Sequence, residues 1–163
     1  MFARHFIDSL DFARNGRELR GEVAVTGLPR LQDMLAAPEG KIAYVVRGLQ
    51  GMDGKPMLEV DLDGSCQLLC QRCLNTLDYP VKQVTRLLLT PESELDEFSD
   101  EESELDSIAA DPHLDVLNMI EEEILLSLPF APKHPLGACQ SVAEGLSQPK
   151  INPFAILAGL KRK

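Results

Sequence analysis

The sequence lacks several features that define whole classes of protein. It has no tryptophan and only two tyrosines, and no stretch approaches the ~18 consecutive apolar residues that a membrane-spanning helix requires. Charged residues interrupt the N-terminal region every few positions, so it contains no apolar core of a signal peptide. We therefore expect a cytoplasmic protein without a membrane segment.

Recognisable catalytic motifs are also missing. The sequence contains no P-loop, no dinucleotide-binding fingerprint and no G-x-S-x-G nucleophile elbow. Two of its three histidines, His5 and His113, stand alone without a matching nucleophile. We expect a protein that acts by binding rather than by catalysis.

What the sequence does contain is enough apolar material for one core. The chain has 163 residues, of which 44% are hydrophobic, which is the size of a single domain spanning residues 1–163. The clearest periodicity lies between residues 58 and 68, where every second residue is apolar or small and the intervening ones are polar. Such alternation is typical of a half-buried antiparallel strand. The positions on the apolar face are Leu58, Val60, Leu62, Gly64, Cys66 and Leu68.

Composition and turn residues predict the other elements. Helices are expected at residues 8–14, 28–36 and 115–128, and strands at 18–25, 41–49, 58–68 and 78–90. In the last of these helices, apolar residues recur at steps of three and four: Leu117, Ile120, Ile124 and Leu128. Residues 121–123 are three glutamates largely off this stripe, which predicts a solvated helix face. The fold class is α+β, an antiparallel β-sheet that could close into a barrel, with a few short helices packed on it.

Acidic charge is concentrated in one segment. Residues 1–90 carry 11 basic and 11 acidic side chains, whereas residues 91–106 carry nine acids and no base. Nine like charges repel one another and leave little to bury, so this segment is predicted to be a mobile, solvated loop. Three alternatives are open: the segment keeps the protein soluble, it imitates nucleic acid and holds a basic partner, or it is an insert without functional consequence. The chain ends in a predicted helix or tail, residues 150–163, that finishes with Lys161, Arg162 and Lys163.

The cysteines follow an uneven spacing. Cys70 and Cys73 form a C-x2-C pair where the strand alternation stops, a geometry that lets two thiolates face one tetrahedral metal ion. His134 and Cys139 are the available candidates for two further ligands, although His134 follows Cys73 by 61 positions. The open alternatives are a Cys3His zinc site and an unmetallated pair of surface thiols. Cys66 shares the parity of the apolar face and is predicted to be a core residue.

Several stretches of the chain match one family in the same order. They are the cysteine pair with its flanking residues (70–74), the acidic segment, residues 114–115, residues 120–129 and the terminal residues 152–163. Over residues 40–163 the chain resembles the YceD family of large ribosomal RNA subunit accumulation proteins. The resemblance implies a small non-enzymatic protein required for normal levels of 23S rRNA. His134 and Cys139 resemble positions that relatives also fill with His and Cys, whereas many other relatives lack this pair.

Two hypotheses follow for the function. In the first, the protein supports ribosome biogenesis by binding either precursor rRNA or a basic large-subunit ribosomal protein. The acidic segment favours the protein partner, because it repels phosphate and attracts Lys/Arg-rich tails. The candidate RNA contacts are Arg72, Lys161, Arg162 and Lys163. In the second, the protein is a zinc-binding structural or regulatory module that makes no direct contact with rRNA.

Overall fold

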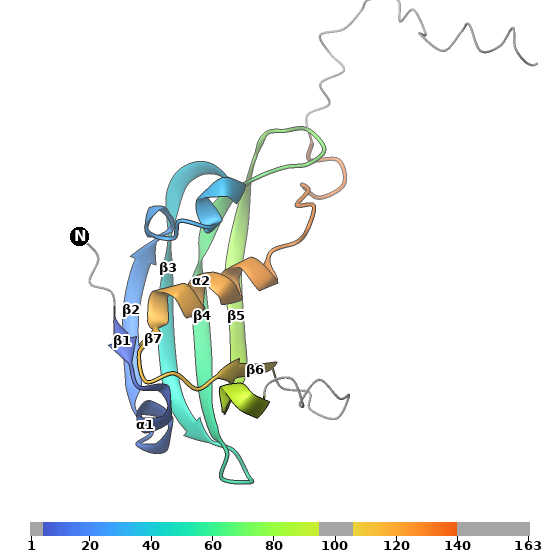
Figure 1. The fold of residues 1–163 in the computed structure, drawn as a ribbon. Coiled ribbons are helices and arrows are strands. Elements are labelled where there is room, and N and C mark those ends of the chain that lie inside the picture. The colour runs from blue at the N-terminus through green and yellow to red at the C-terminus, as the bar shows by residue number, and fades with distance from the viewer. Residues whose placement is uncertain (1–4, 95–105, 140–163) are drawn as a thin grey trace, which may run out of the picture.

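A computed structural model describes residues 5–94 and 106–139 of the chain (Figure 1). The predicted terminal helix and most of the acidic segment lie outside these residues. The elements follow the order β1 (Phe6–Ile7), α1 (Ser9–Arg14), β2 (Glu18–Ala24), β3 (Leu35–Gln50), β4 (Pro56–Leu69), β5 (Thr76–Thr90), β6 (Asp106–Ala109), β7 (Leu114–Asp115) and α2 (Val116–Ser127). Among the described residues, no helix is long and apolar enough to span a membrane.

The main sheet has five strands in the order β2-β3-β4-β5-β6. The first three pairings are antiparallel, and β5 and β6 run parallel. The barrel that the sequence allowed is not formed, because β2 and β6 lie at opposite edges of the sheet and do not pair (Figure 1). A parallel neighbour cannot follow through a tight turn, so the chain needs a long connection between β5 and β6. Residues 91–105, most of the acidic segment, make that connection.

One face of this sheet forms the core. The apolar positions predicted for residues 58–68 lie in β4. Five of them are fully buried: Leu58, Val60, Leu62, Cys66 and Leu68. α2 crosses this face (Figure 1), and its predicted stripe of Leu117, Ile120, Ile124 and Leu128 is buried. Asp115 begins the helix by accepting hydrogen bonds from the N–H groups of Leu117 and Asn118. These predictions are confirmed.

The short helix predicted at 28–36 is only partly correct. The structure has two 3-10 helices instead, Val25–Gly27 and Leu31–Met34, and β3 already begins at Leu35. Leu28, which follows the first of these helices, and Leu31, which begins the second, are both buried. Their side chains anchor this loop to the core. The neighbouring predictions hold: α1 starts after its N-cap Asp8, and β2, β3 and β5 cover the expected strands.

The glutamates of α2 correct the prediction of a solvated face. Glu122 is exposed, but Glu121 is 3% exposed and Glu123 is 8% exposed. The Glu121 carboxylate accepts hydrogen bonds from the backbone N–H groups of Arg30 (2.6 Å) and Leu31 (3.0 Å). It therefore joins α2 to the start of the second 3-10 helix, where unpaired N–H groups attract an anion. Burial raises the pKa of Glu123, although a hydrogen bond with Thr85 opposes this.

Loss of the Glu121 carboxylate should destabilise the fold. Glu121→Ala leaves two N–H groups without their acceptor, and we expect the free energy of unfolding to fall by about 2–3 kcal/mol in urea denaturation. Glu122→Ala is the matched control. It removes only an ion pair with Arg30 whose two side chains are each about half exposed, so its cost should stay below about 1 kcal/mol. Equal costs for the two variants would contradict the anchoring role of Glu121.

Candidate metal centre

The turn between β4 and β5 supplies the first two thiols. The Cys70 N–H donates to the carbonyl of Asn75 (2.9 Å), and the Leu74 N–H donates back to the carbonyl of Cys70 (2.9 Å). Leu74 takes a left-handed conformation with φ of +59°, which reverses the chain tightly. Cys70 and Cys73 are both buried at the base of this turn.

The segment after α2 supplies the other two donors. Pro132 lies in the middle of it, and its carbonyl accepts a hydrogen bond from the N–H of Gln71 (2.8 Å). Prolines favour extended backbone, so the segment runs alongside the β4–β5 turn instead of continuing the helix (Figure 1). His134 and Cys139, both partly exposed, are thereby brought to the cysteine pair.

The four donor atoms lie within 4.8 Å of one another. The Sγ atoms of Cys70 and Cys139 are 3.7 Å apart. His134 Nδ1 lies 3.5 Å from the Sγ of Cys73 and 3.7 Å from that of Cys139. A tetrahedral zinc ion separates two sulfur ligands by about 3.8 Å and a sulfur from a nitrogen by about 3.6 Å. The separations match these edges and are too long for a disulfide, so the four residues predicted as ligands meet in a cluster compatible with zinc binding.

The outer nitrogen of His134 is also held. Its Nε2 lies 3.1 Å from the backbone carbonyl oxygen of Thr76, the first residue of β5. A carbonyl can only accept, so this contact places a proton on Nε2 and turns Nδ1 toward the cysteines. Contacts with Cys70 and Cys139 raise the pKa of His134, and binding of a metal ion at Nδ1 requires that nitrogen to be deprotonated. No pattern of residues in the sequence indicates this contact, because its acceptor is a backbone carbonyl.

Arg72, between the two cysteines of the turn, faces the cluster as well. Its Nε donates to the Sγ of Cys139 (2.9 Å), and its Nη2 donates to the carbonyls of His134 and Pro135 (3.3 Å each). The thiol of Cys139 raises the pKa of Arg72 through this contact. Arg72 thus offsets negative charge on the sulfurs and ties the two segments together. Its role as an RNA contact stays a prediction, as do those of Lys161, Arg162 and Lys163, which lie outside the described residues.

The surroundings shift the pKa of Cys70 and that of Cys66 in opposite directions. Burial disfavours the Cys70 thiolate, but the backbone N–H groups of Cys73, His134 and Arg72 outweigh it and lower the pKa of Cys70 to about 5. For Cys66, burial and then Asp78 raise the pKa to about 11. A metal requires thiolates as ligands. Cys70 is suited to that purpose, and Cys66 is a core residue, as its parity predicted.

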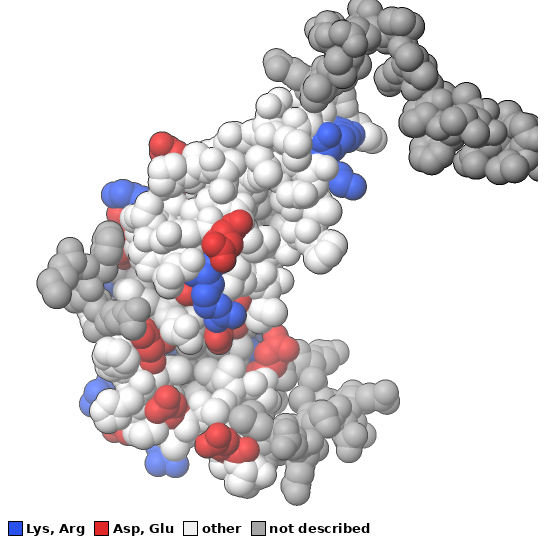
Figure 2. All heavy atoms as spheres, turned by 45° about the horizontal axis from the view of Figure 1, so that its top comes forward, with Lys and Arg blue, Asp and Glu red and all other residues white. Residues whose placement is uncertain are grey.

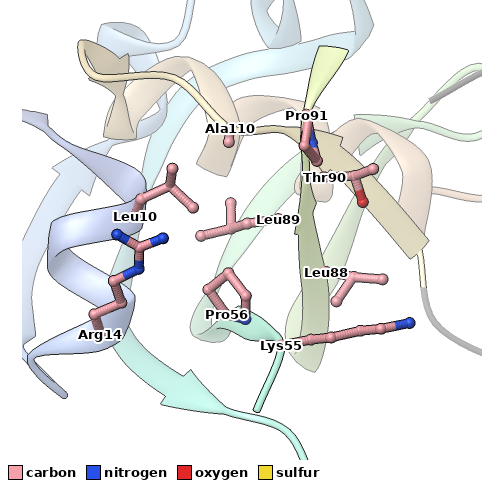
Figure 3. Close-up of a pocket in the computed structure, with 9 residues that line it drawn as sticks. All are labelled: Leu10, Arg14, Lys55, Pro56, Leu88, Leu89, Thr90, Pro91 and Ala110. Atoms are coloured by element: carbon pink, nitrogen blue, oxygen red, sulfur yellow. The ribbon is translucent and has the colours of Figure 1, made fainter. Parts of the chain in front are cut away.

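A separate hollow of about 280 Å³ lies at the other end of the sheet (Figure 3). Apolar side chains such as Leu10, Leu88 and Leu89 line it, and Arg14 and Lys55 stand at its sides. Its lining includes no cysteine, histidine or carboxylate. It therefore offers neither metal ligands nor a nucleophile with its base.

Fold and cluster together define a small α+β protein whose open sheet carries a Cys3His knuckle at one end. Residues 58–161 match the family described as "Large ribosomal RNA subunit accumulation protein YceD", a range that includes all four cluster residues. The protein of that name from Haemophilus influenzae is 28% identical, over 96% of this chain and 95% of the relative. No solved structure matches. The chain belongs to the YceD family, which is named for the accumulation of large-subunit rRNA and not for a reaction.

Loss of one cluster cysteine should abolish metal binding. In native mass spectrometry we expect the purified protein to carry one zinc ion, and Cys139→Ser to carry none. The variant should also melt at least about 5 °C lower, because zinc bound to the folded state stabilises it. Cys66→Ala is the matched control and should keep its zinc, since Cys66 lies outside the cluster. A metal-free wild type with four reduced thiols, or a Cys139→Ser protein with full zinc, would contradict this.

Proposed function

We propose that this protein supports accumulation of 23S rRNA in the cytoplasm by binding, without catalysis, and that its partner is a basic large-subunit ribosomal protein. The family name supports the process. The observation that favours a basic protein over naked rRNA is the arrangement of charge on the surface.

The basic side chains of the body are largely neutralised within the chain. A protein that binds RNA through its phosphates presents a patch or stripe of Lys and Arg side chains that are not neutralised by carboxylates. Here the solvent face of the sheet is a network of alternating signs, in which Arg47 contacts Glu18 and Glu59, and Glu59 also contacts Arg86. On the side of the molecule that carries α2, Figure 2 also shows acidic and basic side chains interspersed. Seven described Lys and Arg residues form ion pairs: Arg17, Arg20, Arg30, Lys41, Arg47, Lys82 and Arg86.

Acidic charge, in contrast, is available in excess. The chain has a formal net charge of −10, and nine acids lie in residues 91–106. This segment connects β5 to β6, so both of its ends are fixed by the sheet. A concentrated acidic segment attracts the Lys/Arg-rich extensions of ribosomal proteins and repels RNA phosphate. We infer that it shields such an extension from nonspecific contact with RNA until assembly.

Zinc has a structural role in this proposal. Cys70, Cys73, His134 and Cys139 would hold the ion, and a closed four-ligand site leaves no open position for a substrate. When bound, zinc supplies a crosslink between the β4–β5 turn and the segment after α2. The alternative is that the protein is only a zinc-binding structural module without a ribosomal partner. The next experiment distinguishes this alternative from our proposal.

Neutralising the acidic segment should weaken the binding of the partner. We would replace each Asp and Glu of residues 95–105 by Asn and Gln in the full chain, leaving Asp106 because β6 begins there. Affinity for basic large-subunit ribosomal proteins, measured by calorimetry at low salt, should fall at least about tenfold. A permuted segment with the same charge is the control and should bind like the wild type.

Two results would overturn the proposal. One is equal affinity of the neutralised variant and the wild type for every basic ribosomal protein tested. The other is tight binding of a 23S rRNA fragment by the wild type that falls steeply with salt and is lost on replacing Lys161, Arg162 and Lys163 by alanine. That result would assign the precursor rRNA as the partner instead.

A further inference from the structure

The strand β2 leaves one edge of the main sheet open. It pairs with β3 on one side, and no described strand pairs with its other side (Figure 1). The N–H of Gly48, in β3, donates to the carbonyl of Arg17, the residue before β2 (2.8 Å). Arg17 and Gly48 are therefore a hydrogen-bonded pair of the β2–β3 ladder. Hydrogen-bonded pairs alternate along an antiparallel ladder. The even-numbered residues of β2 therefore direct their N–H and C=O groups toward the open edge: Glu18, Arg20, Glu22 and Ala24.

The side chains of these residues alternate in sign. Glu18, Arg20 and Glu22 are exposed on the solvent face of the sheet, opposite the buried Val23. Edge strands are usually protected from pairing by charges that repel a second strand. Alternating charges repel a second copy in some registers and attract it in others, so the order Glu-x-Arg-x-Glu specifies a register.

Two antiparallel registers satisfy both the backbone and the charges. With Leu19 opposite Leu19 of the second copy, Arg20 lies opposite Glu18, but only residues 18–20 of β2 overlap. With Gly21 opposite Gly21 of the second copy, the two strands overlap over all of Glu18–Ala24. Arg20 then lies opposite Glu22 of the second copy, and Glu22 opposite its Arg20. Both residues belong to the set that points N–H and C=O groups outward, so these are hydrogen-bonded pairs. A shift that places Arg20 opposite Arg20, or Glu22 opposite Glu22, sets like charges against each other and is disfavoured.

We propose that two copies of this chain associate through β2, forming one continuous sheet across a two-fold axis at Gly21. An interface with the same patch on both copies is the usual arrangement of a homodimer. Backbone hydrogen bonds supply the attraction and the charges select the register. Arg20 and Glu22 already contact Glu18 and Lys41 within the chain, so the new ion pairs extend an existing network. A single strand pair buries little area, and the dimer is concentration-dependent.

Charge reversal tests the register directly. Sedimentation velocity of the full chain from about 1 µM to about 1 mM should show a monomer–dimer equilibrium. Arg20→Glu and Glu22→Arg each place like charges opposite each other and should weaken dimerisation at least about tenfold. An equimolar mixture of these two variants restores opposite charges at both positions, and should form a heterodimer with near wild-type affinity. Lys82→Glu, an exposed charge reversal on β5, is the control and should dimerise like the wild type.

Three results would overturn the proposal. They are a wild type that stays monomeric at about 1 mM, single variants that dimerise as well as the wild type, and a mixture that fails to associate. Circular dichroism of each variant checks that the fold is intact, which keeps a loss of pairing distinct from a loss of structure.

Discussion

The convergence of three thiols and one imidazole determines how one end of this protein is built. The donors come from two segments far apart in the sequence, and they lie within 4.8 Å of one another. Deprotonated thiols at such separations repel each other unless positive charge lies between or beside them. Arg72 supplies one positive charge at the edge of the cluster through its contact with Cys139, and we infer that zinc supplies the charge at its centre. The donor cluster and the hydrogen bonds that Gln71 and Arg72 give to the segment after α2 hold this segment, up to Cys139, against the β4–β5 turn.

The sheet and α2 bring together the two segments that carry the cluster of Cys70, Cys73, His134 and Cys139. α2 lies on the sheet through its apolar stripe and is joined to the loop above it by Glu121. These contacts fix the position of α2 on the sheet. The segment that follows the helix then reaches the β4–β5 turn, where His134 Nδ1 faces the Sγ atoms of Cys73 and Cys139. On the other face of the sheet, arginines and carboxylates satisfy each other. Most of the excess negative charge lies in the sequence that connects β5 to β6, the segment that we propose binds a basic partner.

Local patterns in the sequence predicted what depends on neighbouring residues. The alternation from Leu58 to Leu68 identified β4 and the buried face of Cys66, and the spacing of Leu117, Ile120 and Ile124 identified the buried face of α2. Contacts between distant segments were harder to predict. Glu121 looked solvated because helical periodicity does not report that a loop 90 positions earlier covers it. The sequence could not decide between a barrel and an open sheet, because a barrel requires the two edge strands, here β2 and β6, to pair with each other. The four candidate metal ligands were identified by residue type and by the C-x2-C spacing of two of them, while their approach to one another required the structure.

Coordination of zinc by Cys70, Cys73, His134 and Cys139 can be tested directly. X-ray absorption at the zinc edge of the purified full-length protein measures the number and type of ligands directly. We expect three sulfur atoms at about 2.3 Å and one nitrogen at about 2.0–2.1 Å. A first shell made mainly of oxygen, or one with fewer than three sulfurs in a protein whose thiols are reduced, would contradict coordination by these three cysteines and one histidine.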